Sequence, residues 1–490
     1  MNLFSAGSCL FIAKIVFIIS GYAIYAALPR LLGQNEFGIF LLVNSVVAVL
    51  NAVFITGTIQ TVSKFISEAP ARGATVMRAA RRLQLLLAGG VSALYFAAAP
   101  VIANLLRDPS LTGYLQVSAV IPFCYALYAV SIGYLNGHRR FVQQSLFDIA
   151  FSIIKVSLVV TLPILGYGAM GAVGGFSAAA AVILAAALLF VRPGPSDAAE
   201  SPIRPATILK FELAVMAYVG LMNLLMQTDL MMVKRLSPVD AGNALAAAYG
   251  AAVKLAQIPQ SLLVALNFVI FPLIARAVAE GDASKTSGYI AQALRLCVIL
   301  VCGPATILAL VSGDALRLVF GAAYASSADV LATLSFGYMA LSLLGVALTV
   351  INSAGKPMHS CLIVGGTLML QVVMNAVLIP QYGLRGAALG TASAYTGGFV
   401  ISLVYLKGRF ASTIPALTVV RVAAATAIVA VIGSFLAPHV PFLVSVALMG
   451  IVYAVAIFAL GEVRLAEIVS LTGRGTLDSK AAPLPRAVRL

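Results

Sequence analysis

Three lysines lie inside stretches of the sequence that are otherwise apolar: Lys14, Lys155 and Lys254. A charge at the centre of a bilayer costs about 2.5–3.5 kcal/mol on insertion scales, so such residues usually face a water-filled cavity or a partner. An ammonium group is a compact donor for phosphate oxygens. Several lysines in one cavity therefore predict a site for an anionic group such as a diphosphate. For Lys14, near the start of its helix, a side chain that reaches back to the membrane surface is the alternative.

Two carboxylates, Asp148 and Asp229, also lie in apolar sequence. Asp148 precedes Lys155 by seven residues, so the two share one face of a helix. We predict that both carboxylates take part in coupling transport to an ion. In the alternative interpretation each pairs with a basic residue close in sequence. Those neighbours are Arg139 and Arg140 for Asp148, and Lys234 and Arg235 for Asp229.

Uncharged polar residues extend the candidate binding surface. Gln257 follows Lys254 by three residues and lies on the same helix face. Asn51 and Asn223 lie in other apolar stretches, and we assign them to the same substrate site. Hydrogen bonding between helices is the alternative for both asparagines.

The composition defines a membrane protein. Of the 490 residues, 61% are hydrophobic and 10% are charged, whereas soluble domains contain about 25% charged residues. Apolar segments of about 20 residues, the length of a spanning helix, follow one another along the chain. The sequence therefore predicts an all-α polytopic membrane protein. The net charge of +15 is explained by basic loops, not by nucleic-acid binding.

Enzymatic chemistry finds little support in the residues. The three histidines, His138, His359 and His439, are scattered at predicted helix ends. No spacing typical of metal ligands or of an acid–base pair occurs near them. We therefore expect no catalytic residue, no metal and no cofactor, and a membrane enzyme of polysaccharide assembly is the less favoured hypothesis.

Hydropathy and turn signals predict about fourteen transmembrane helices. Most of the 31 Lys and Arg residues fall in every second loop and in the tail, which places those loops and both termini in the cytoplasm. The predicted spans are 9–31, 37–66, 83–106, 113–136, 143–165, 169–191, 209–233, 241–272, 288–312, 327–352, 359–380, 385–406, 415–436 and 440–462.

Two internal matches divide the chain into halves. The turn from Arg30 to Gly38 resembles the turn from Lys234 to Gly242, and Tyr167-Gly168 resembles Tyr382-Gly383. Both copies run in the same direction, so we expect two pseudo-symmetric six-helix bundles related by an axis along the membrane normal. The predicted parts are an N-terminal bundle (1–192), a cytoplasmic linker (193–207), a C-terminal bundle (208–410), helices 13 and 14 (411–462) and a cytoplasmic tail (463–490).

These turns resemble those of a known family. Leu32-Gly33-Gln34-Asn35-Glu36-Phe37-Gly38, Phe271-Pro272 and the stretch Asn375–Ala388 are similar to hallmarks of the polysaccharide-exporter and O-antigen flippase branch of the multidrug/oligosaccharidyl-lipid/polysaccharide (MOP) superfamily. The resemblance covers nearly all of residues 1–462.

The resemblance implies a V-shaped pair of helix bundles in a bacterial inner membrane. It implies flipping of undecaprenyl-diphosphate-linked oligosaccharide from the cytoplasmic to the outer leaflet by alternating access, with membrane lipid and a polysaccharide polymerase as further partners. A lipid II flippase and a MATE-type multidrug antiporter are the alternatives. A drug-cation exporter would need buried carboxylates where this chain has lysines. The residues leave the sugar unit and the coupling ion open.

Overall fold

The computed structural model describes residues 3–193, 205–261, 263, 273–436 and 439–463. Within those ranges the chain is helical and contains no strand. Most of the linker 193–207, the Phe271-Pro272 pair and nearly all of the tail from residue 463 lie outside the described residues.

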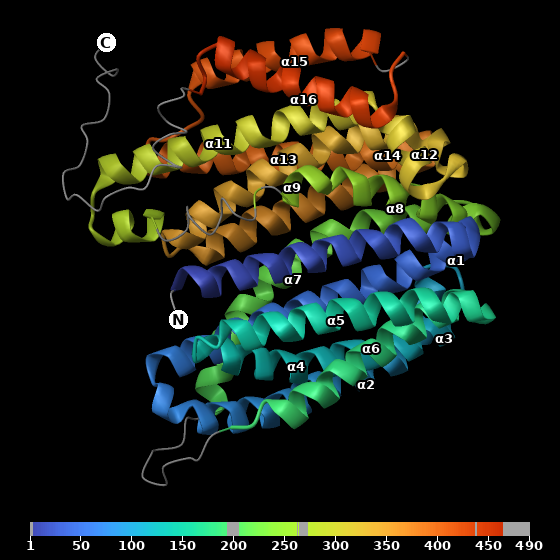
Figure 1. Cartoon of the computed structure of the whole chain (residues 1–490), viewed down its shortest axis with the longest axis vertical. Coiled ribbons are helices and arrows are strands. Elements are labelled where there is room, and N and C mark those ends of the chain that lie inside the picture. Colours follow the sequence, from blue (N-terminus) through green and yellow to red (C-terminus); the bar gives the residue numbers. More distant parts are fainter. Residues whose placement is uncertain (1–2, 194–204, 262, 264–272, 437–438, 464–490) are drawn as a thin grey trace.

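The N half consists of helices that pack around α1 (Figure 1). Helix α1 contacts α4, α5 and α6, and α2 and α3 cover the remaining side. The elements are α1 (Leu3–Glu68), η1 (Pro70–Arg72), α2 (Gly73–Leu105), α3 (Leu111–Ser118), α4 (Val120–Gly137), α5 (Phe141–Leu162), η2 (Pro163–Tyr167) and α6 (Gly168–Phe190).

The C half lies above the N half in Figure 1, and α13 and α14 pack at its centre. Helices α15 and α16 pack on α11 at the edge of this half. The elements are α7 (Pro205–Leu236), η3 (Val239–Ala241), α8 (Gly242–Ala256), α9 (Ile258–Ser261), α11 (Ala283–Leu310), α12 (Ser312–Phe320), η4 (Ala322–Ser327), α13 (Ala328–Ser353), α14 (Pro357–Phe410), α15 (Ala416–Leu436) and α16 (Phe442–Ala459).

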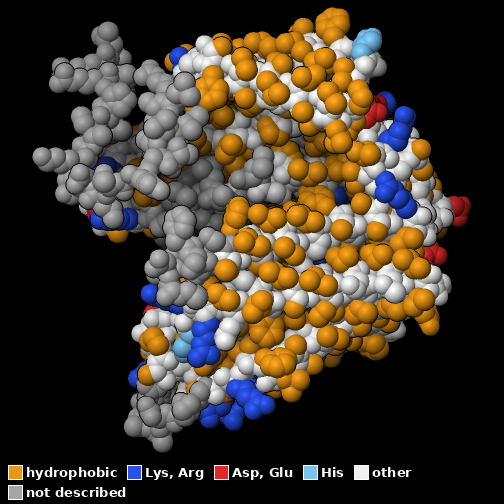
Figure 2. All heavy atoms as spheres, viewed as in Figure 1, with side chains coloured by type: hydrophobic (Ala, Val, Ile, Leu, Met, Phe, Trp, Pro, Cys, Tyr) orange, Lys and Arg blue, Asp and Glu red, His pale blue; other side chains and the backbone are white. Residues whose placement is uncertain are grey.

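Ten helices of the described chain are long and apolar enough to cross a membrane. Three of these segments have 60, 50 and 54 residues, whereas a single crossing needs about 20. Each long segment bends at a glycine, so each contains two of the predicted helices. The all-helical membrane fold is confirmed, and the count of fourteen stays a prediction. Figure 2 shows apolar side chains over most of the described surface in this view, as a lipid-facing surface requires.

The bends explain the second internal match. Gly168 and Gly383 adopt nearly the same left-handed conformation, with φ of 54° and 57°, which costs glycine little because it has no Cβ. Just beyond each bend a further glycine lets two helices touch: a Cβ at Gly171 would lie 3.0 Å from the backbone of Leu162, and one at Gly386 would lie 2.0 Å from that of Leu378. The repeated sequence therefore encodes the same tight helical hairpin in both halves.

The first turn motif contributes a cap to the same hairpin. Glu36 Oε2 accepts a hydrogen bond of 2.8 Å from the backbone N–H of Ala169, in the first turn of α6. A carboxylate at a helix N-terminus satisfies a free N–H group and complements the helix dipole. Glu36 is thus a structural residue of the N half.

The bends lie at the same end of the molecule, which we call the Gly33 end; the chain begins at the opposite end (Figure 1). The predicted topology places the Gly33 end outside the cell, and that orientation stays a prediction.

The last two helices are fastened to the C half by a buried carboxylate. Glu462, 1% exposed, accepts hydrogen bonds from Arg295 Nε and Thr418 Oγ1, both at 2.7 Å. Burial disfavours its ionised form, but the bonds from Thr418 and Arg295 and the charge of Arg295 outweigh that cost and lower the pKa of Glu462. Glu462 therefore attaches the pair formed by α15 and α16 to α11, at the edge of the C half.

Candidate functional site

The structure brings the three membrane lysines together from α1, α5 and α8. The ammonium groups of Lys14 and Lys155 lie 5.7 and 5.9 Å from the centroid of the same ring, that of Phe17. Lys155 also lies 4.5 Å from the centroid of Phe176, and its charge is close enough to that of Lys254 for the two to repel. Aromatic faces stabilise ammonium groups without neutralising them, so we call these lysines the basic cluster.

Lys254 links the two halves within this cluster. Its ammonium group, on α8, lies 5.0 Å from the ring centroid of Tyr25, on α1. The Tyr22 hydroxyl donates to the backbone oxygen of Lys254 at 3.4 Å, and Asn44 donates to the Tyr25 hydroxyl at 3.3 Å. Within the described part of the chain, none of the three lysines forms an ion pair with a carboxylate. An anionic ligand would therefore meet positive charges that have no carboxylate partner there.

The other predicted substrate residues lie in different surroundings. Gln257 lines a pocket of about 480 Å³ between α1, α7 and α13, beside Tyr22 and Ser261. Asn51 is buried, and its side-chain oxygen has no hydrogen-bond partner. Asn223 donates to Val219 of its own helix at 2.9 Å. Their substrate roles stay predictions, and the Asn223 bond favours a structural role for that residue.

Asp148 does not pair with the arginines that precede its helix. In the described structure neither Arg139 nor Arg140 forms an ion pair with it, so the alternative interpretation is wrong for this residue. Lys14 attracts it electrostatically. Asp148 therefore lies at the edge of the basic cluster.

Asp229 is the centre of a second polar cluster, in the C half. The side chain is 0% exposed, and it accepts hydrogen bonds from the Leu230 N–H at 2.8 Å and the Tyr249 hydroxyl at 3.0 Å. The Tyr249 hydroxyl lies 3.3 Å from Thr391 Oγ1. The predicted alternative, pairing with Lys234, is wrong because Lys234 binds elsewhere; Arg235 forms no ion pair with Asp229 in the described structure either.

Two buried amides complete this second cluster. Asn375 and Gln371 on α14 direct their amide nitrogens at Thr391 Oγ1, at 3.4 and 3.5 Å. Their amide oxygens are buried and accept no hydrogen bond, and an unpaired buried acceptor costs about 1–3 kcal/mol. A buried carboxylate that is connected through Tyr249 and Thr391 to two amides with free oxygens is a polar environment that suits a small cation. No local sequence pattern assigns Asn375, Gln371, Thr391 or Tyr249 to this site, because only the fold brings them into one network with Asp229.

The two halves are closed against each other at the Gly33 end. Lys234 Nζ, on α7, forms an ion pair of 2.8 Å with Asp108, between α2 and α3, and the two side chains are only 2% and 14% exposed. Asn243 donates to the same carboxylate at 3.0 Å. Phe37 of α1 packs on Tyr324, with ring centroids 6.2 Å apart. We call the contacts of Asp108, Lys234 and Asn243 the Asp108 lock.

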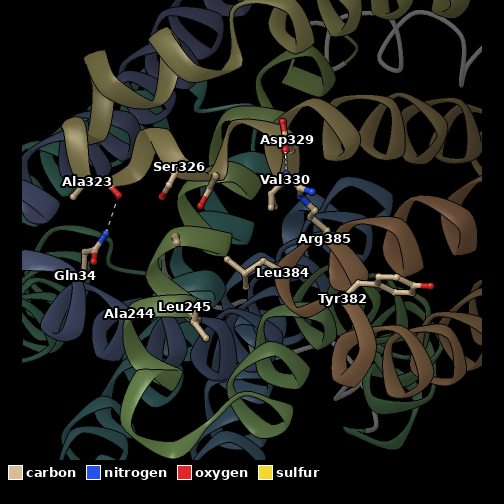
Figure 3. Close-up of a pocket in the computed structure, with 12 residues that line it drawn as sticks. Gln34, Ala244, Leu245, Ala323, Ser326, Asp329, Val330, Tyr382, Leu384 and Arg385 are labelled. Atoms are coloured by element: carbon tan, nitrogen blue, oxygen red, sulfur yellow. Dashed lines mark hydrogen bonds and ion pairs between the residues drawn. The ribbon is translucent and has the colours of Figure 1, made fainter.

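A pocket of about 410 Å³ lies at the rim of this closed end (Figure 3). Gln34 reaches it from α1 and donates to the backbone oxygen of Ala323 at 3.1 Å. On its other side Arg385 forms an ion pair with Asp329, and Tyr382 points outward (Figure 3). This pocket is lined by no residue of the basic cluster, so it belongs to the closed Gly33 end and not to the lysine site.

These features define a class: a multi-pass helical membrane protein with two halves that are closed against each other at one end, and with polar clusters between and within the halves. The chain matches the family described as polysaccharide biosynthesis protein over residues 27–329. It belongs to that family.

Solved structures with this fold are transporters and flippases. The lipid II flippase MurJ, in an inward closed conformation, is similar with a TM-score of 0.76 at 14% identity, over 94% of this chain and 100% of that one. An inward-facing multidrug resistance MATE transporter of the MOP superfamily gives 0.68 at 18% identity, over 81% and 94%. An outward-facing one gives 0.59 at 17%, over 82% and 94%. The MOP fold is thereby confirmed.

Sequence comparison adds a relative of similar length. Stage V sporulation protein B of Bacillus subtilis is 22% identical over 414 residues, 79% of each chain. Matches to uncharacterised membrane proteins of Methanocaldococcus jannaschii and B. subtilis, each 25% identical, cover only 27% and 29% of those proteins and 28% and 32% of this chain. The fold neighbours whose names state an activity are transporters or a flippase.

Proposed function

We propose that this protein flips an undecaprenyl-diphosphate-linked oligosaccharide from the cytoplasmic to the outer leaflet. The basic cluster supports the proposal most directly, because it offers several ammonium groups without carboxylate partners where the two halves meet. A diphosphate replaces its hydration with such donors, while the lipid tail stays in the bilayer. The family, which is one of polysaccharide biosynthesis, agrees with this substrate.

The mechanism that we infer is alternating access between the halves. In this conformation the Asp108 lock closes the Gly33 end, which we assign to the outer side of a bacterial inner membrane, with both termini in the cytoplasm. The higher similarity to an inward-facing than to an outward-facing MATE transporter supports the same assignment. Transport then requires the lock to open after the head group has bound the basic cluster.

The test is transport of a fluorescent lipid-diphosphate oligosaccharide across reconstituted vesicles. We expect transport of the diphosphate lipid, little transport of the same lipid with a neutral linkage, and none of a drug cation. Lipid II serves as a further substrate arm, because MurJ shares the fold over its whole chain. Equal transport of the neutral lipid, or preference for the cation, would contradict the proposal.

We further propose that Asp229 couples transport to a small monovalent cation, either a proton or sodium. The buried carboxylate and the free oxygens of Asn375 and Gln371 support this role. A tenfold ion gradient is worth about 1.4 kcal/mol per ion, so Asp229→Asn should lose up to about tenfold of the gradient-driven accumulation.

Accumulation is measured with a pH gradient alone and with a sodium gradient alone, which tells the two ions apart. Asp240→Asn, an exposed carboxylate in η3, is the matched control and should respond to gradients as the wild type does. If the Asp229→Asn protein still accumulates substrate in response to the pH or sodium gradient, the coupling ion binds elsewhere.

A further inference from the structure

Helix α7 is shared between the two halves. Its first turns pack on the N half: the Phe211 ring lies 6.3 Å from that of Phe65 on α1, and Met216 packs in a cluster with Phe54 and Ala88. Its later turns belong to the C half, where Tyr395 donates to the Leu225 carbonyl at 3.3 Å. A relative movement of the halves must therefore bend α7 or detach one of its ends.

A buried carboxylate holds the first turns of α7 against the N half. Glu212 is 1% exposed, and its Oε1 atom accepts hydrogen bonds from Thr58 Oγ1 of α1 at 2.7 Å and from Gln84 Nε2 of α2 at 2.6 Å. A Cβ at Gly57 would touch the Glu212 side chain, so α1 and α7 are in close contact here. We call this contact the Glu212 seam.

No positive charge accompanies Glu212 among the residues that the structure describes. On α1, Lys64 lies over the Phe211 ring, 4.0 Å from its centroid, and also approaches Glu68. On α2, Arg81 donates to Ser131 and to the Val191 carbonyl. Neither side chain forms an ion pair with Glu212, so within the described part of the chain an ionised carboxylate would be buried there without a counter-charge.

The energetics favour a neutral carboxyl. Removing an ion from water costs several kcal/mol even after the protein relaxes, and the bonds from Thr58 and Gln84 offset only part of that cost. A carboxylic acid keeps the bond from Thr58 without the charge, and its O–H group adds a donor that can replace the bond from the Gln84 nitrogen.

An acceptor for that donor is present at the seam. Gln84 is 1% exposed, and its side-chain oxygen is buried without a hydrogen-bond partner. Rotation of the Gln84 amide would turn this oxygen toward Glu212, and the assignment of amide oxygen and nitrogen follows from such a network. The seam therefore lacks one donor hydrogen, which a proton on Glu212 supplies.

We propose that Glu212 is a proton-binding site: its carboxyl is protonated while α7 lies against α1 and α2, and it releases the proton to water when the Glu212 seam separates. In the closed seam the Glu212 carboxyl is neutral and shielded from water. In the open seam it is a hydrated carboxylate. Raising the pH therefore favours separation of the seam, because the closed seam binds one proton more than the open one. This site is distinct from Asp229, at the other end of α7.

Infrared spectroscopy of the full-length protein in lipid tests the protonation directly and needs no transport substrate, so its outcome is independent of the proposed function. At neutral pH we expect a carbonyl band of a protonated carboxyl that disappears in Glu212→Gln. Glu280→Gln, which removes an exposed carboxylate, should leave the band unchanged. A spectrum that is the same in wild type and Glu212→Gln overturns the proposal.

If Glu212→Gln is too unstable to purify, Gln84→Leu allows the same decision. This variant keeps the carboxyl and removes its proposed acceptor. The band should therefore remain and shift in frequency. A band unaffected by Gln84→Leu belongs to another carboxyl, which contradicts the assignment.

Distances between spin labels test the link to movement. Labels at Leu86 of α2 and Thr207 of α7, both exposed, should separate as the pH rises, with the ratio of open to closed seam changing by up to about tenfold per pH unit. Glu212→Gln should stay closed at every pH, and Glu280→Gln should behave as the wild type. A wild-type distance that ignores pH, or that instead follows sodium concentration at constant pH, overturns the proposal.

Discussion

Replacing Lys254 by arginine, glutamine and glutamate should lower transport of the diphosphate lipid progressively, in that order. Arginine keeps the charge, although its forked group is bulkier than an ammonium. Glutamine keeps a donor but loses the charge, and a hydrogen bond to a charged group is worth about 1.5–3 kcal/mol. A loss of about 2 kcal/mol of binding free energy corresponds to about thirtyfold weaker binding of the diphosphate lipid. Glutamate adds repulsion to that loss, so its transport should fall further.

The structure explains why Lys254 should dominate this series. Its ammonium group lies on the Tyr25 ring, between the halves, and it reinforces the positive field of Lys155. The assay compares initial rates at limiting substrate in vesicles with matched protein levels. Lys356→Gln, an exposed lysine between α13 and α14, is the control and should be fully active.

Two outcomes would contradict the anion interpretation. If Lys254→Gln transports as well as the wild type, the position acts by hydrogen bonding or packing. If Lys254→Glu improves transport, the cluster selects cations, and the multidrug-cation hypothesis replaces the flippase hypothesis.

Opening of the Gly33 end should follow from breaking the Asp108 lock. Losing one partner of a buried ion pair costs about 3–5 kcal/mol, and both Lys234 and Asp108 are largely buried. Asp108→Lys or Lys234→Asp should therefore shift the population of the open outer end by roughly a hundredfold or more. The double exchange, Asp108→Lys with Lys234→Asp, should restore most of the closed state.

Spin labels at Leu105 and Val239, exposed residues on opposite sides of the lock, measure this opening. Both single variants should lengthen the distance between the labels, and the double variant should shorten it again. Unchanged distances in the single variants would show that the other contacts of this end, such as those of Phe37 and Gln34, are enough to hold it closed.

The Asp108 lock should also respond to acid. Burial raises the pKa of Asp108, but the hydrogen bonds from Lys234, Ser110 and Asn243 and the charge of Lys234 outweigh it, so the pKa lies below the usual value. A lowered pKa stabilises the closed end at pH values above the ordinary carboxyl pKa, about 3.9. That stabilisation is lost as the pH falls through the lowered value. The labels should therefore separate only in strong acid, opposite to the response of the Glu212 seam.

The sequence predicted the features that depend on local patterns. The repeated glycines predicted equivalent turns, and Gly168 and Gly383 indeed share one conformation. The lysines within apolar stretches predicted a shared site; the structure brings all three together, and their facing a cavity stays a prediction. Hydropathy predicted the helical membrane fold, although it cannot show that Gly33 joins two helices without a loop.

Contacts between distant segments were not predictable in the same way. Lys234 was considered as a partner for Asp229, five residues away, but it binds Asp108, 126 residues away. Glu212 near the start of a helix looks like a surface residue, and only the crossing of α7 onto the N half buries it. Asp229 accepts from Tyr249 of α8, and Tyr249 in turn contacts Thr391 of α14. In each case the role of the residue depends on a contact with a distant segment. Neither the helical periodicity nor the spacing of residues along the sequence encodes such a contact.

The bends at Gly33, Gly168 and Gly383 each join two helices directly, so three helical hairpins have no loop at the Gly33 end of the molecule. An inserted epitope or fluorescent protein needs flexible linking residues on both sides, and these turns have none. Left-handed backbone at each bend also admits few side chains other than glycine. Tags for imaging or purification should therefore be placed in the connections of the opposite end, such as the one between α13 and α14. An antibody raised against the folded Gly33 end must recognise helix ends and short turns, because that end offers few flexible peptides.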